Sequence, residues 1–357
     1  MRKILIINIF GIGDVLFTTP LVRSLRENFP GAYIAYVCSQ RAYSVLEHNP
    51  HLDKIYIYEK DDYRALWKKS RVQAIQKAIA ALAEIRSQQF DVVVDLSLNR
   101  LFNFLSWAFG VPERIGFNYK NRSPFLTKKV PIKGFEDKHV VEHYLSLLQF
   151  FRVKPRSQKM EVFSTAADQS WAEGALRQNG IKPGERVVAL IPGGGVSWGK
   201  DVVFRRWPVE RHAQLVDKII AKFKVKVILL GDLSEQPLAT ELRSTMKNSV
   251  IDFIGQTSVG QYLAFFSRCE LVVLNDGGPL HMAVAAGART VSLIGPVDEK
   301  IYGPYPPQGH GIVTQNIACR PCYRSFRHAD CEHISCLRQI TVEDVFEKVE
   351  EILKEKI

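Results

Sequence analysis

The feature that most constrains the fold is a regular alternation of short apolar runs, rich in β-branched residues, with longer segments of helical pattern. Such runs occur at 3–9, 33–38, 54–58, 91–96, 186–191, 224–230, 249–254, 271–275 and 290–295. Continuously apolar strands are typical of parallel sheets that helices cover on both faces. The pattern therefore predicts an α/β protein with doubly wound sheets.

The alternation of strands and helices runs twice along the chain. We expect helices at 64–88, 138–152, 208–222, 234–246, 258–268 and 278–287. Residues 118–137 are interpreted as a polar connection, and the Pro- and Lys-containing stretch 153–164 is a candidate linker. A chain of 357 residues is long for one core and comfortable for two.

We therefore expect two Rossmann-like domains, at 1–160 and 161–340, followed by a C-terminal helix at 341–357. Thr341 would cap this helix, for which packing back on the first domain is one option. Ligands of open α/β sheets bind outside the carboxyl ends of the strands. Two such domains facing each other would place the site in the cleft between them.

Charge is uneven along the chain. Residues 1–170 contain 25 Lys and Arg against 16 Asp and Glu, and the remainder contains 23 against 21. A basic field favours an anionic partner, such as nucleic acid, a phosphorylated substrate or an acidic membrane face, although a surface kept basic for solubility fits as well. Nucleic acid is the weakest of these partners, because the sequence contains no recognised module and no aromatic-basic motif.

The N-terminal stretch MRKILIINIF begins like a secretory signal. Asp14 interrupts the apolar run and no small-residue cleavage site follows, so we expect a first strand instead. No window offers 18 uninterrupted apolar residues, and a membrane span is not expected. These features predict a cytoplasmic protein.

The stretch NIFGIGDVLFTTP (8–20) follows the first strand, where the chain would turn into a helix. Gly11 and Gly13 permit unusual backbone angles and the close approach of a ligand. A dinucleotide loop would need a third glycine at Leu16, which argues against that function. Asp14 is either an N-cap or a catalytic carboxylate on this stretch alone, and Thr18 belongs to the same candidate loop.

A second candidate loop, IPGGGVSWGKDVVFRRWP (191–208), lies between a strand and a helix. Its candidate ligand groups are Gly193, Gly194, Gly195, Ser197, Lys200, Arg205 and Arg206. Backbone N–H groups and cationic side chains in one loop suit a diphosphate. It is not a Walker loop, because the lysine is misplaced and no Ser or Thr follows it. A flexible basic loop without a ligand is the alternative.

A third candidate loop opens the stretch LNDGGPLHMAVAAGARTVSLIGP (274–296). Asp276, Gly277 and Gly278 would turn the chain, and Pro279 suits a first helical turn. The helix N-terminus could hold a phosphate while Asp276 binds sugar hydroxyls. His281, on the first turn, is either close to the ligand or a packed structural histidine.

Two carboxylates in LLGDLSEQP (229–237) also follow a strand. Asp232 or Glu235 could bind ribose hydroxyls there, and surface turn chemistry explains them equally well.

Four late cysteines form a separate cluster. Cys319, Cys322, Cys331 and Cys336 have the spacing C-x2-C-x8-C-x4-C, and four thiolates in one short stretch could bind a structural zinc ion. The second pair lacks the usual C-x2-C spacing, so reduced thiols in a packed loop remain an alternative. Disulfides are disfavoured in a cytoplasmic chain.

Taken together, these stretches resemble the heptosyltransferase family, glycosyltransferase family 9. GIGDVLFTTPLVRSLRENFPGAYI looks like the family's opening segment, and IPGGGVSWGKDVVFRRWP is similar to its phosphate loop. NDGGPLHMAVAAGARTVSLIGP looks like its donor-site signature. The resemblance covers nearly the whole chain and implies a GT-B fold, with two doubly wound Rossmann-like domains facing across a cleft.

The resemblance also implies a reaction. Family members transfer a sugar, typically heptose from ADP-heptose, with inversion and without a metal, onto a lipopolysaccharide core acceptor at the inner membrane face. Asp14 matches the family's general base. Lys200, with Arg205 or Arg206, would hold the diphosphate, while Asp276 and His281 match the donor-sugar residues. The partners would be a nucleotide-diphosphate sugar, a lipid-linked anionic glycan and the inner-membrane surface, to which the protein would be peripheral.

The chain departs from the family in two places. Gly277 stands where many members have Ser or Thr, and the loop between Gly193 and Trp207 looks longer. Both departures leave the phosphate ligand and the donor sugar open. Rival functions are a sugar-nucleotide epimerase and a non-catalytic protein that binds nucleotide sugars.

Overall fold

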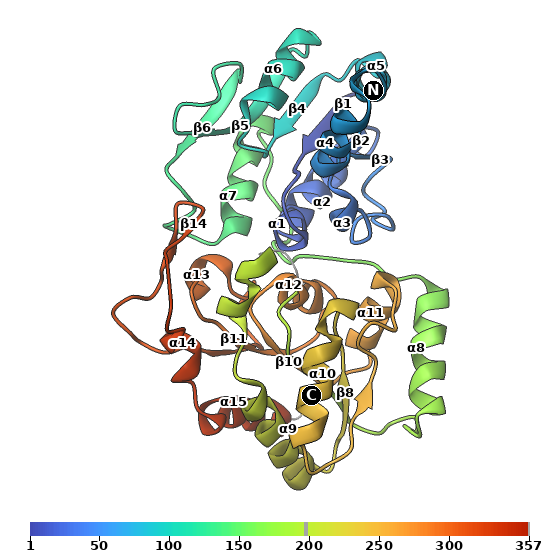
Figure 1. The fold of residues 1–357 in the computed structure, drawn as a ribbon. Coiled ribbons are helices and arrows are strands. Elements are labelled where there is room, and N and C mark those ends of the chain that lie inside the picture. Colours follow the sequence, from blue (N-terminus) through green and yellow to red (C-terminus); the bar gives the residue numbers. More distant parts are fainter. Residues whose placement is uncertain (196–198, 356–357) are drawn as a thin grey trace. The chain divides into compact units, whose positions relative to one another are not determined.

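The structure is a computed structural model that describes residues 1–195 and 199–355, without the side chains of Lys60, Tyr63 and Lys200. The chain forms two compact units. The first comprises Met1–Gly134 and Val141–Gln158, and the second comprises Phe135–Val140 and Lys159–Ile357. Each unit is built around its own parallel sheet of six described strands (Figure 1).

The sheet of the first unit has the order β3-β2-β1-β4-β5-β6. Its strands are β1 (Lys3–Ile7), β2 (Tyr33–Cys38), β3 (Lys54–Ile57), β4 (Val92–Asp95), β5 (Glu113–Tyr119) and β6 (Lys128–Ile132). The first four confirm the apolar runs. Strand β6 corrects the interpretation of 118–137 as a connection. Its lysines and Pro131 hide it in the sequence, and they are tolerated because β6 is an edge strand whose residues are only partly buried or exposed.

Helices of the first unit are α1 (Ile12–Leu16), α2 (Thr19–Asn28), α3 (Gln40–Tyr43), α4 (Lys60–Lys69), α5 (Arg71–Ser87), α6 (Arg100–Ala108), α7 (Val140–Ser146) and the 3-10 turn η1 (Leu147–Phe151). The long helix expected at 64–88 is two helices. Ser70 breaks it with an extended backbone, and its hydroxyl then caps α5 by accepting from Gln73 N at 3.3 Å.

The sheet of the second unit has the order β12-β11-β10-β7-β8-β9. Its strands are β7 (Val187–Ile191), β8 (Lys226–Leu229), β9 (Ile251–Asp252), β10 (Leu271–Asn275), β11 (Thr290–Leu293) and β12 (Gly311–Val313). Its helices are α8 (Ala166–Gln178), α9 (Val209–Phe223), α10 (Gln236–Thr245), α11 (Val259–Phe266), α12 (Gly278–Ala285), α13 (Glu299–Tyr302), α14 (Ser335–Arg338) and α15 (Val342–Lys354). Two 3-10 turns, η2 (Gly199–Arg205) and η3 (Leu233–Glu235), and a hairpin of β13 (Tyr323–Arg324) and β14 (Arg327–His328) complete it.

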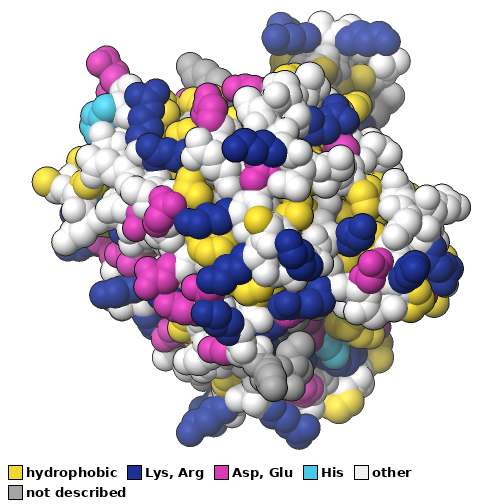
Figure 2. Space-filling model, turned by 90° about the horizontal axis from the view of Figure 1, so that it is seen from below, with side chains coloured by type: hydrophobic (Ala, Val, Ile, Leu, Met, Phe, Trp, Pro, Cys, Tyr) yellow, Lys and Arg dark blue, Asp and Glu magenta, His cyan; other side chains and the backbone are white. Residues whose placement is uncertain are grey.

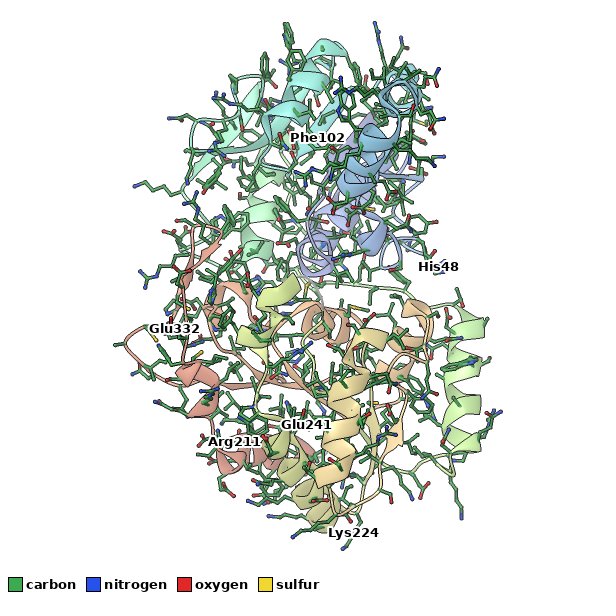
Figure 3. All side chains as sticks on the ribbon, viewed as in Figure 1. His48, Phe102, Arg211, Lys224, Glu241 and Glu332 are labelled. Carbon is green, nitrogen blue, oxygen red and sulfur yellow. The ribbon has the colours of Figure 1, made fainter. Side chains whose placement is uncertain are left out.

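The C-terminal helix α15 belongs to the core of the second unit. Thr341 caps it in a reciprocal box with Asp344, as expected. The helix packs against α9 and β12 of the second unit. Trp207 anchors the approach to α15 by donating its indole N–H to Ile340 O at 3.0 Å. Arg211 of α9, labelled in Figure 3, donates to the same carbonyl.

The surface of the second unit mixes both signs of charge. Exposed ion pairs link α9 to α15, among them Lys218–Glu343 at 2.8 Å. On the face that Figure 2 shows, Lys and Arg side chains lie among Asp and Glu side chains. Such pairs contribute roughly 0–1 kcal/mol each to stability. No helix in the described part of the chain is long and apolar enough to cross a membrane.

Both sheets share one topology, and it determines where ligands can bind. In each, the chain lays down three strands in one direction and then returns to the centre to build outward the other way. The order reverses between β1 and β4 in the first unit, and between β7 and β10 in the second. Ligands of doubly wound sheets bind at the carboxyl ends of the strands at this switch point. The loops after β1, β7 and β10 are the three loops that the sequence motifs indicated.

Candidate functional site

Asp14 lies on α1, the single helical turn that follows β1 at the switch point of the first unit. Gly11 precedes this turn without a side-chain cap. The buried side chain of Asn8 donates its amide to the Asp14 carbonyl oxygen at 3.1 Å and accepts from Phe10 N at 3.1 Å. The side chain of Asn8 therefore holds the backbone of this loop. Asp14 is not the N-cap of α1, a place that Gly11 takes.

Thr18 links the end of α1 to β2 of the sheet. Its hydroxyl lies 2.6 Å from Val15 O and 2.8 Å from the Tyr36 hydroxyl, and the residue is fully buried. Burial raises the pKa of Tyr36, and Asp14 raises it further through its charge. Its place in the candidate loop stays a prediction, and its hydroxyl positions the turn that carries Asp14.

Asp95 is a buried carboxylate that the sequence analysis did not single out. It ends β4 and pairs in register with Ile7 of β1, so it lies at the same switch point as the loop after β1. Its Oδ1 accepts from Ser97 N at 2.9 Å and from the Ser97 hydroxyl at 2.5 Å. Burial nevertheless raises the pKa of Asp95 to about 6. The sequence feature that could have indicated Asp95 is an aspartate at the end of a buried strand.

Asn275 joins the two loops at the switch point of the second unit. Its side chain is fully buried. Its amide donates to Pro192 O, after β7, at 2.6 Å, and its oxygen accepts from Trp207 N at 3.1 Å. One side chain thus links the end of β10, the start of α9 and the loop after β7 that contains Gly193, Gly194 and Gly195, called the glycine loop below.

Glycines let these two loops touch. Gly194 and Gly195 have φ of +88° and +76°, and Gly277 has φ of +153°. A Cβ on Gly277 would collide with the carbonyl oxygen of Gly194, and one on Gly195 would lie 3.1 Å from Cδ of Pro279. The glycine loop therefore lies directly against the N-terminus of α12, at which Gly278 and Pro279 are partly exposed. The α12 helix has no side-chain cap, so its first N–H groups are available to an anion.

Glu235, rather than Asp232, faces the glycine loop. Glu235 is 1% exposed and accepts from Gly195 N at 3.2 Å and from Asp232 N at 3.0 Å. Burial raises its pKa, against the opposing effects of these hydrogen bonds and of Arg206. Asp232 is exposed and accepts from Ser234 N at 2.9 Å as the cap of η3. Asp232 and Glu235 thus cap η3 reciprocally, and of the two only the Glu235 carboxylate is directed inward.

The two arginines of the second loop have different surroundings. Arg206 donates to Gly193 O at 2.9 Å and lies 3.9 Å from Glu235, so it holds the loop. Arg205, which is partly buried, lies 3.5 Å from Oδ2 of the buried Asp276. Burial raises the pKa of Asp276, while the charges of Arg205 and Arg320 oppose this. Arg320, distant in the sequence, was not foreseen.

His281 is buried on the first turn of α12. Burial lowers its pKa to about 3, and the charges of His139 and Arg205 add to this effect. The ring is therefore neutral at physiological pH. His139 Nε2 donates to Gly303 O at 3.1 Å, and the ring stacks on Tyr305. It comes from 135–140, the short segment that joins the second unit out of sequence order, which is why the sequence analysis missed it.

Two further predicted ligands cannot be placed. Ser197 lies outside the described residues, and Lys200 is described only by its backbone in η2. Their roles stay predictions from the sequence.

The cysteine cluster is gathered around the β13–β14 hairpin. Burial raises the pKa of Cys336 to about 11, and the charges of Cys322, Cys331 and Cys319 contribute. Cys322 Sγ lies 3.7 Å from His328 Nε2. All four thiols are free, and no three His, Cys, Asp or Glu side chains among the described residues are arranged to hold a metal ion. The described geometry therefore gives the zinc hypothesis no support beyond spacing.

Comparison with known proteins gives matches along the chain. The model of glycosyltransferase family 9 (heptosyltransferase) matches residues 79–333. Lipopolysaccharide heptosyltransferase 3 of Escherichia coli K12 is 22% identical over 357 residues, covering 96% of both chains. The glycosyl transferase family 9 structure from Veillonella parvula has a TM-score of 0.82 at 23% identity, covering 99% of this chain and 98% of that one. E. coli heptosyltransferase WaaC with ADP has a TM-score of 0.73 at 18% identity, with 98% and 100% covered. These likenesses confirm the expected α/β architecture.

We predict that Gly277→Ala separates the two loops of the second unit. The added Cβ would collide with Gly194 O, so either the backbone shifts or the contact is lost. We expect about 1–3 kcal/mol of destabilisation, measured by denaturant unfolding. Gly287→Ala is the matched control, because Gly287 also has a positive φ, of +83°, but no atom within 4 Å of the added Cβ. Equal losses in the two variants would show that loop contact is not what requires glycine.

We predict a pH-dependent effect of Asp95→Asn. The folded-state pKa of Asp95 is raised from 3.8 to about 6, so its contribution to stability is present below pH 4 and lost as pH rises through 6. The free energy of unfolding of Asp95→Asn minus that of the native protein should rise by about 3 kcal/mol between pH 4 and pH 8. Exposed Asp62→Asn is the control. A difference that does not change with pH would contradict the burial of an ionisable Asp95.

Proposed function

Because the chain belongs to glycosyltransferase family 9, the heptosyltransferases, we propose that it transfers heptose from ADP-heptose to the core of a lipid-linked lipopolysaccharide precursor, with inversion at the anomeric carbon. The fold is the GT-B arrangement of two Rossmann-like domains found in that family. The first domain would bind the acceptor and the second the donor. The role of each residue is proposed from this membership and from the geometry of each unit.

The observation that carries the proposal is the contact between the glycine loop and the N-terminus of α12. The uncapped N–H groups of α12 and the backbone N–H group of Gly194 suit a diphosphate, while that of Gly195 already donates to Glu235. Arg205, beside Asp276, and Lys200 would add positive charge. A similar protein, E. coli WaaC, was solved with ADP and with ADP-2-deoxy-2-fluoro heptose, which supports an ADP-sugar.

Two buried acids are available for the rest of the donor. Glu235 lies at the carboxyl end of the strand after the glycine loop, a place where a carboxylate suits ribose hydroxyls. Asp276 would bind sugar hydroxyls. Neutral His281 would serve as a hydrogen-bonding group and not as a charge. Gly277, in place of a hydroxyl residue, contributes close loop contact instead of a donor group.

The transfer itself needs one proton acceptor. The acceptor hydroxyl oxygen attacks the anomeric carbon, and the bond from that carbon to the diphosphate oxygen breaks. Asp14 takes the hydroxyl proton, and the electron pair leaves with ADP. Fixed N–H groups and cations stabilise the charge that develops on the diphosphate. Asp14 suits this role because it lies on the single turn α1, directly after β1 at the switch point of the first unit. The enzyme would work in the cytoplasm, at the inner membrane face.

We predict that Asp14→Asn slows transfer by two to four orders of magnitude, the usual contribution of a general base. Donor affinity should survive, since Asp14 would act only on the acceptor. Acceptor-dependent ADP release measures the rate, and calorimetry measures donor binding. The matched control is Asp91→Asn, at an exposed site of the same unit. Unchanged turnover in Asp14→Asn would remove it from the mechanism.

We also predict that Lys200→Ala weakens ADP-sugar binding by about 10- to 150-fold, the effect of losing one hydrogen bond to a charged group. Lys222→Ala, on α9 and paired with Glu350, is the control. Calorimetry with ADP-heptose and with ADP gives the two affinities. An affinity equal to that of the native protein would assign the diphosphate to the arginines instead.

A further inference from the structure

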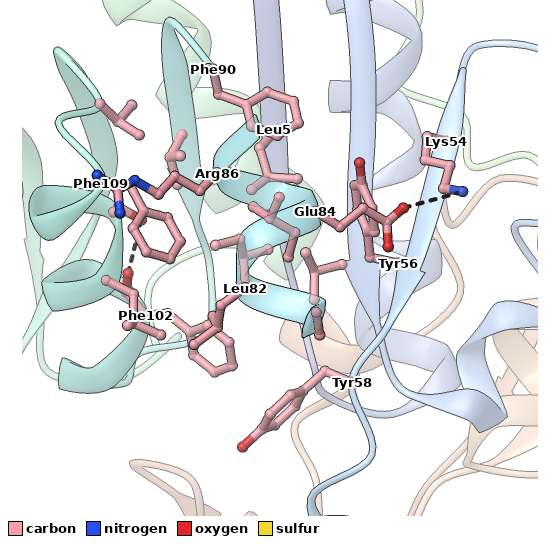
Figure 4. A pocket seen from close by; sticks show the side chains of 18 of the residues that line it. Leu5, Lys54, Tyr56, Tyr58, Leu82, Glu84, Arg86, Phe90, Phe102 and Phe109 are labelled. Atoms are coloured by element: carbon pink, nitrogen blue, oxygen red, sulfur yellow. Dashed lines mark hydrogen bonds and ion pairs between the residues drawn. The ribbon is translucent and has the colours of Figure 1, made fainter. Parts of the chain in front are cut away.

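An apolar cavity lies in the first unit between the sheet and helices α5 and α6 (Figure 4). Its volume is about 510 Å³. Leu82 of α5, Phe102 of α6, and Phe90 and Phe109 line it, with Leu5 of β1 at its floor. The interface of a helix layer with a sheet normally contains few voids larger than a water molecule. A cavity of this size therefore indicates a place for an occupant.

The lining selects the kind of occupant. The volume falls within the roughly 300–1,000 Å³ range of small-molecule sites. Apolar walls do not offer water its hydrogen bonds, so such a space favours an apolar group. The charged residues of the lining are Lys54, Glu84 and Arg86, all of them exposed, and Lys54 pairs with Glu84 at 3.5 Å. An occupant with an apolar body and a polar end matches this arrangement.

Helix α5 carries a second apolar face that points outward. Val72, Ile75 and Ile79 recur at helical spacing and are 65%, 46% and 60% exposed. Residues lining the cavity, such as Ala78 and Leu82, adjoin this face, because Leu82 follows Ile75 by seven residues, about two helical turns. The helix has a single fully buried residue among those described, Ala74. It is thus apolar toward both the cavity and solvent.

Exposed aromatic residues also occur on α4 and α6, the helices before and after α5 in the chain. Trp67 of α4 is 49% exposed, and Phe104 and Trp107 of α6 are 41% and 51% exposed. The segment 60–87 contains seven Lys and Arg against three Asp and Glu. Apolar and aromatic side chains among basic ones are typical of surfaces that contact an anionic membrane.

We propose that the cavity beneath α5 binds one acyl chain of the lipid-anchored acceptor, which enters from the membrane across the exposed faces of α4, α5 and α6. The occupant is an alkyl chain because the walls are apolar, and it belongs to an anionic lipid because the surrounding surface is basic. The inference rests on the proposed function only for the identity of that lipid. The acyl chain would hold the acceptor to the first unit while its glycan remains outside the cavity.

The test fills the cavity. Ala81 lines it and Ala80, the next residue of α5, is exposed and does not. Ala81→Phe should weaken binding of a fluorescent polyene fatty acid at least tenfold, and Ala80→Phe should not. It should also raise the ratio of KM for the acylated acceptor to KM for the deacylated acceptor at least tenfold. Leu82→Gln, which places an amide in the cavity at similar volume, should do the same if Ala81→Phe does not fold.

The outcomes separate the two proposals. Probe binding by Ala81→Phe and Leu82→Gln equal to that of the native protein would overturn the acyl-chain site, as would a KM ratio that stays constant. Fatty-acid binding that is lost in these variants, in a protein that releases no ADP with either acceptor, would support the cavity site and contradict the proposed transfer. Equal loss in Ala80→Phe would show that the probe binds the outer face instead.

Discussion

The contact between the glycine loop after β7 and the N-terminus of α12 is the constraint on which the second unit's site depends. It exists because Gly277 leaves room for the Gly194 carbonyl oxygen, with which any Cβ would collide. Buried Asn275, at the end of β10, also holds the loop after β7 through Pro192 O and Trp207 N. Each such hydrogen bond contributes about 1 kcal/mol net, and losing one partner costs about 1–3 kcal/mol. The loops are therefore preorganised before a donor arrives, which is what electrostatic stabilisation of a leaving diphosphate requires.

Burial controls the charges around this contact. Glu235 and Asp276 both have raised pKa values because they are buried, and each has an arginine nearby that opposes the shift. Arg206 is committed to the loop through Gly193 O, whereas Arg205 lies beside Asp276. When a ligand binds, such a carboxylate can accept from the ligand's hydroxyls, while the cation that it releases binds the phosphates. In the first unit, hydrogen bonds of Thr18 and Asn8 fix the turn that carries Asp14.

Much of this could be predicted from the sequence, because buried parallel strands are continuous apolar runs and the motifs follow them. The switch-point loops were found in this way. What the sequence could not show depended on contacts between side chains. Thr18, predicted with the loop of Asp14, bonds to Tyr36 in the core, and Glu235 could not be distinguished from Asp232 without the cap between them. Strand β6 was hidden by the composition that an edge strand tolerates.

Residues far apart in sequence account for the rest. His139 and Arg320 act on His281 and Asp276 through space, from segments about 140 and 40 residues away in the sequence. No periodicity or spacing connects such pairs. The cysteines show the opposite case, because their spacing indicated a metal site that the described side chains do not form.

The most direct test of the central claim is the anomeric configuration of the product, determined by NMR after incubation with ADP-heptose and a deacylated core acceptor. The proposed inverting transfer predicts that ADP is released only when acceptor is present. It also predicts a new glycosidic bond whose anomeric configuration is opposite to that of the donor. Conversion of ADP-heptose without acceptor, or a product that retains the donor's configuration, would contradict it.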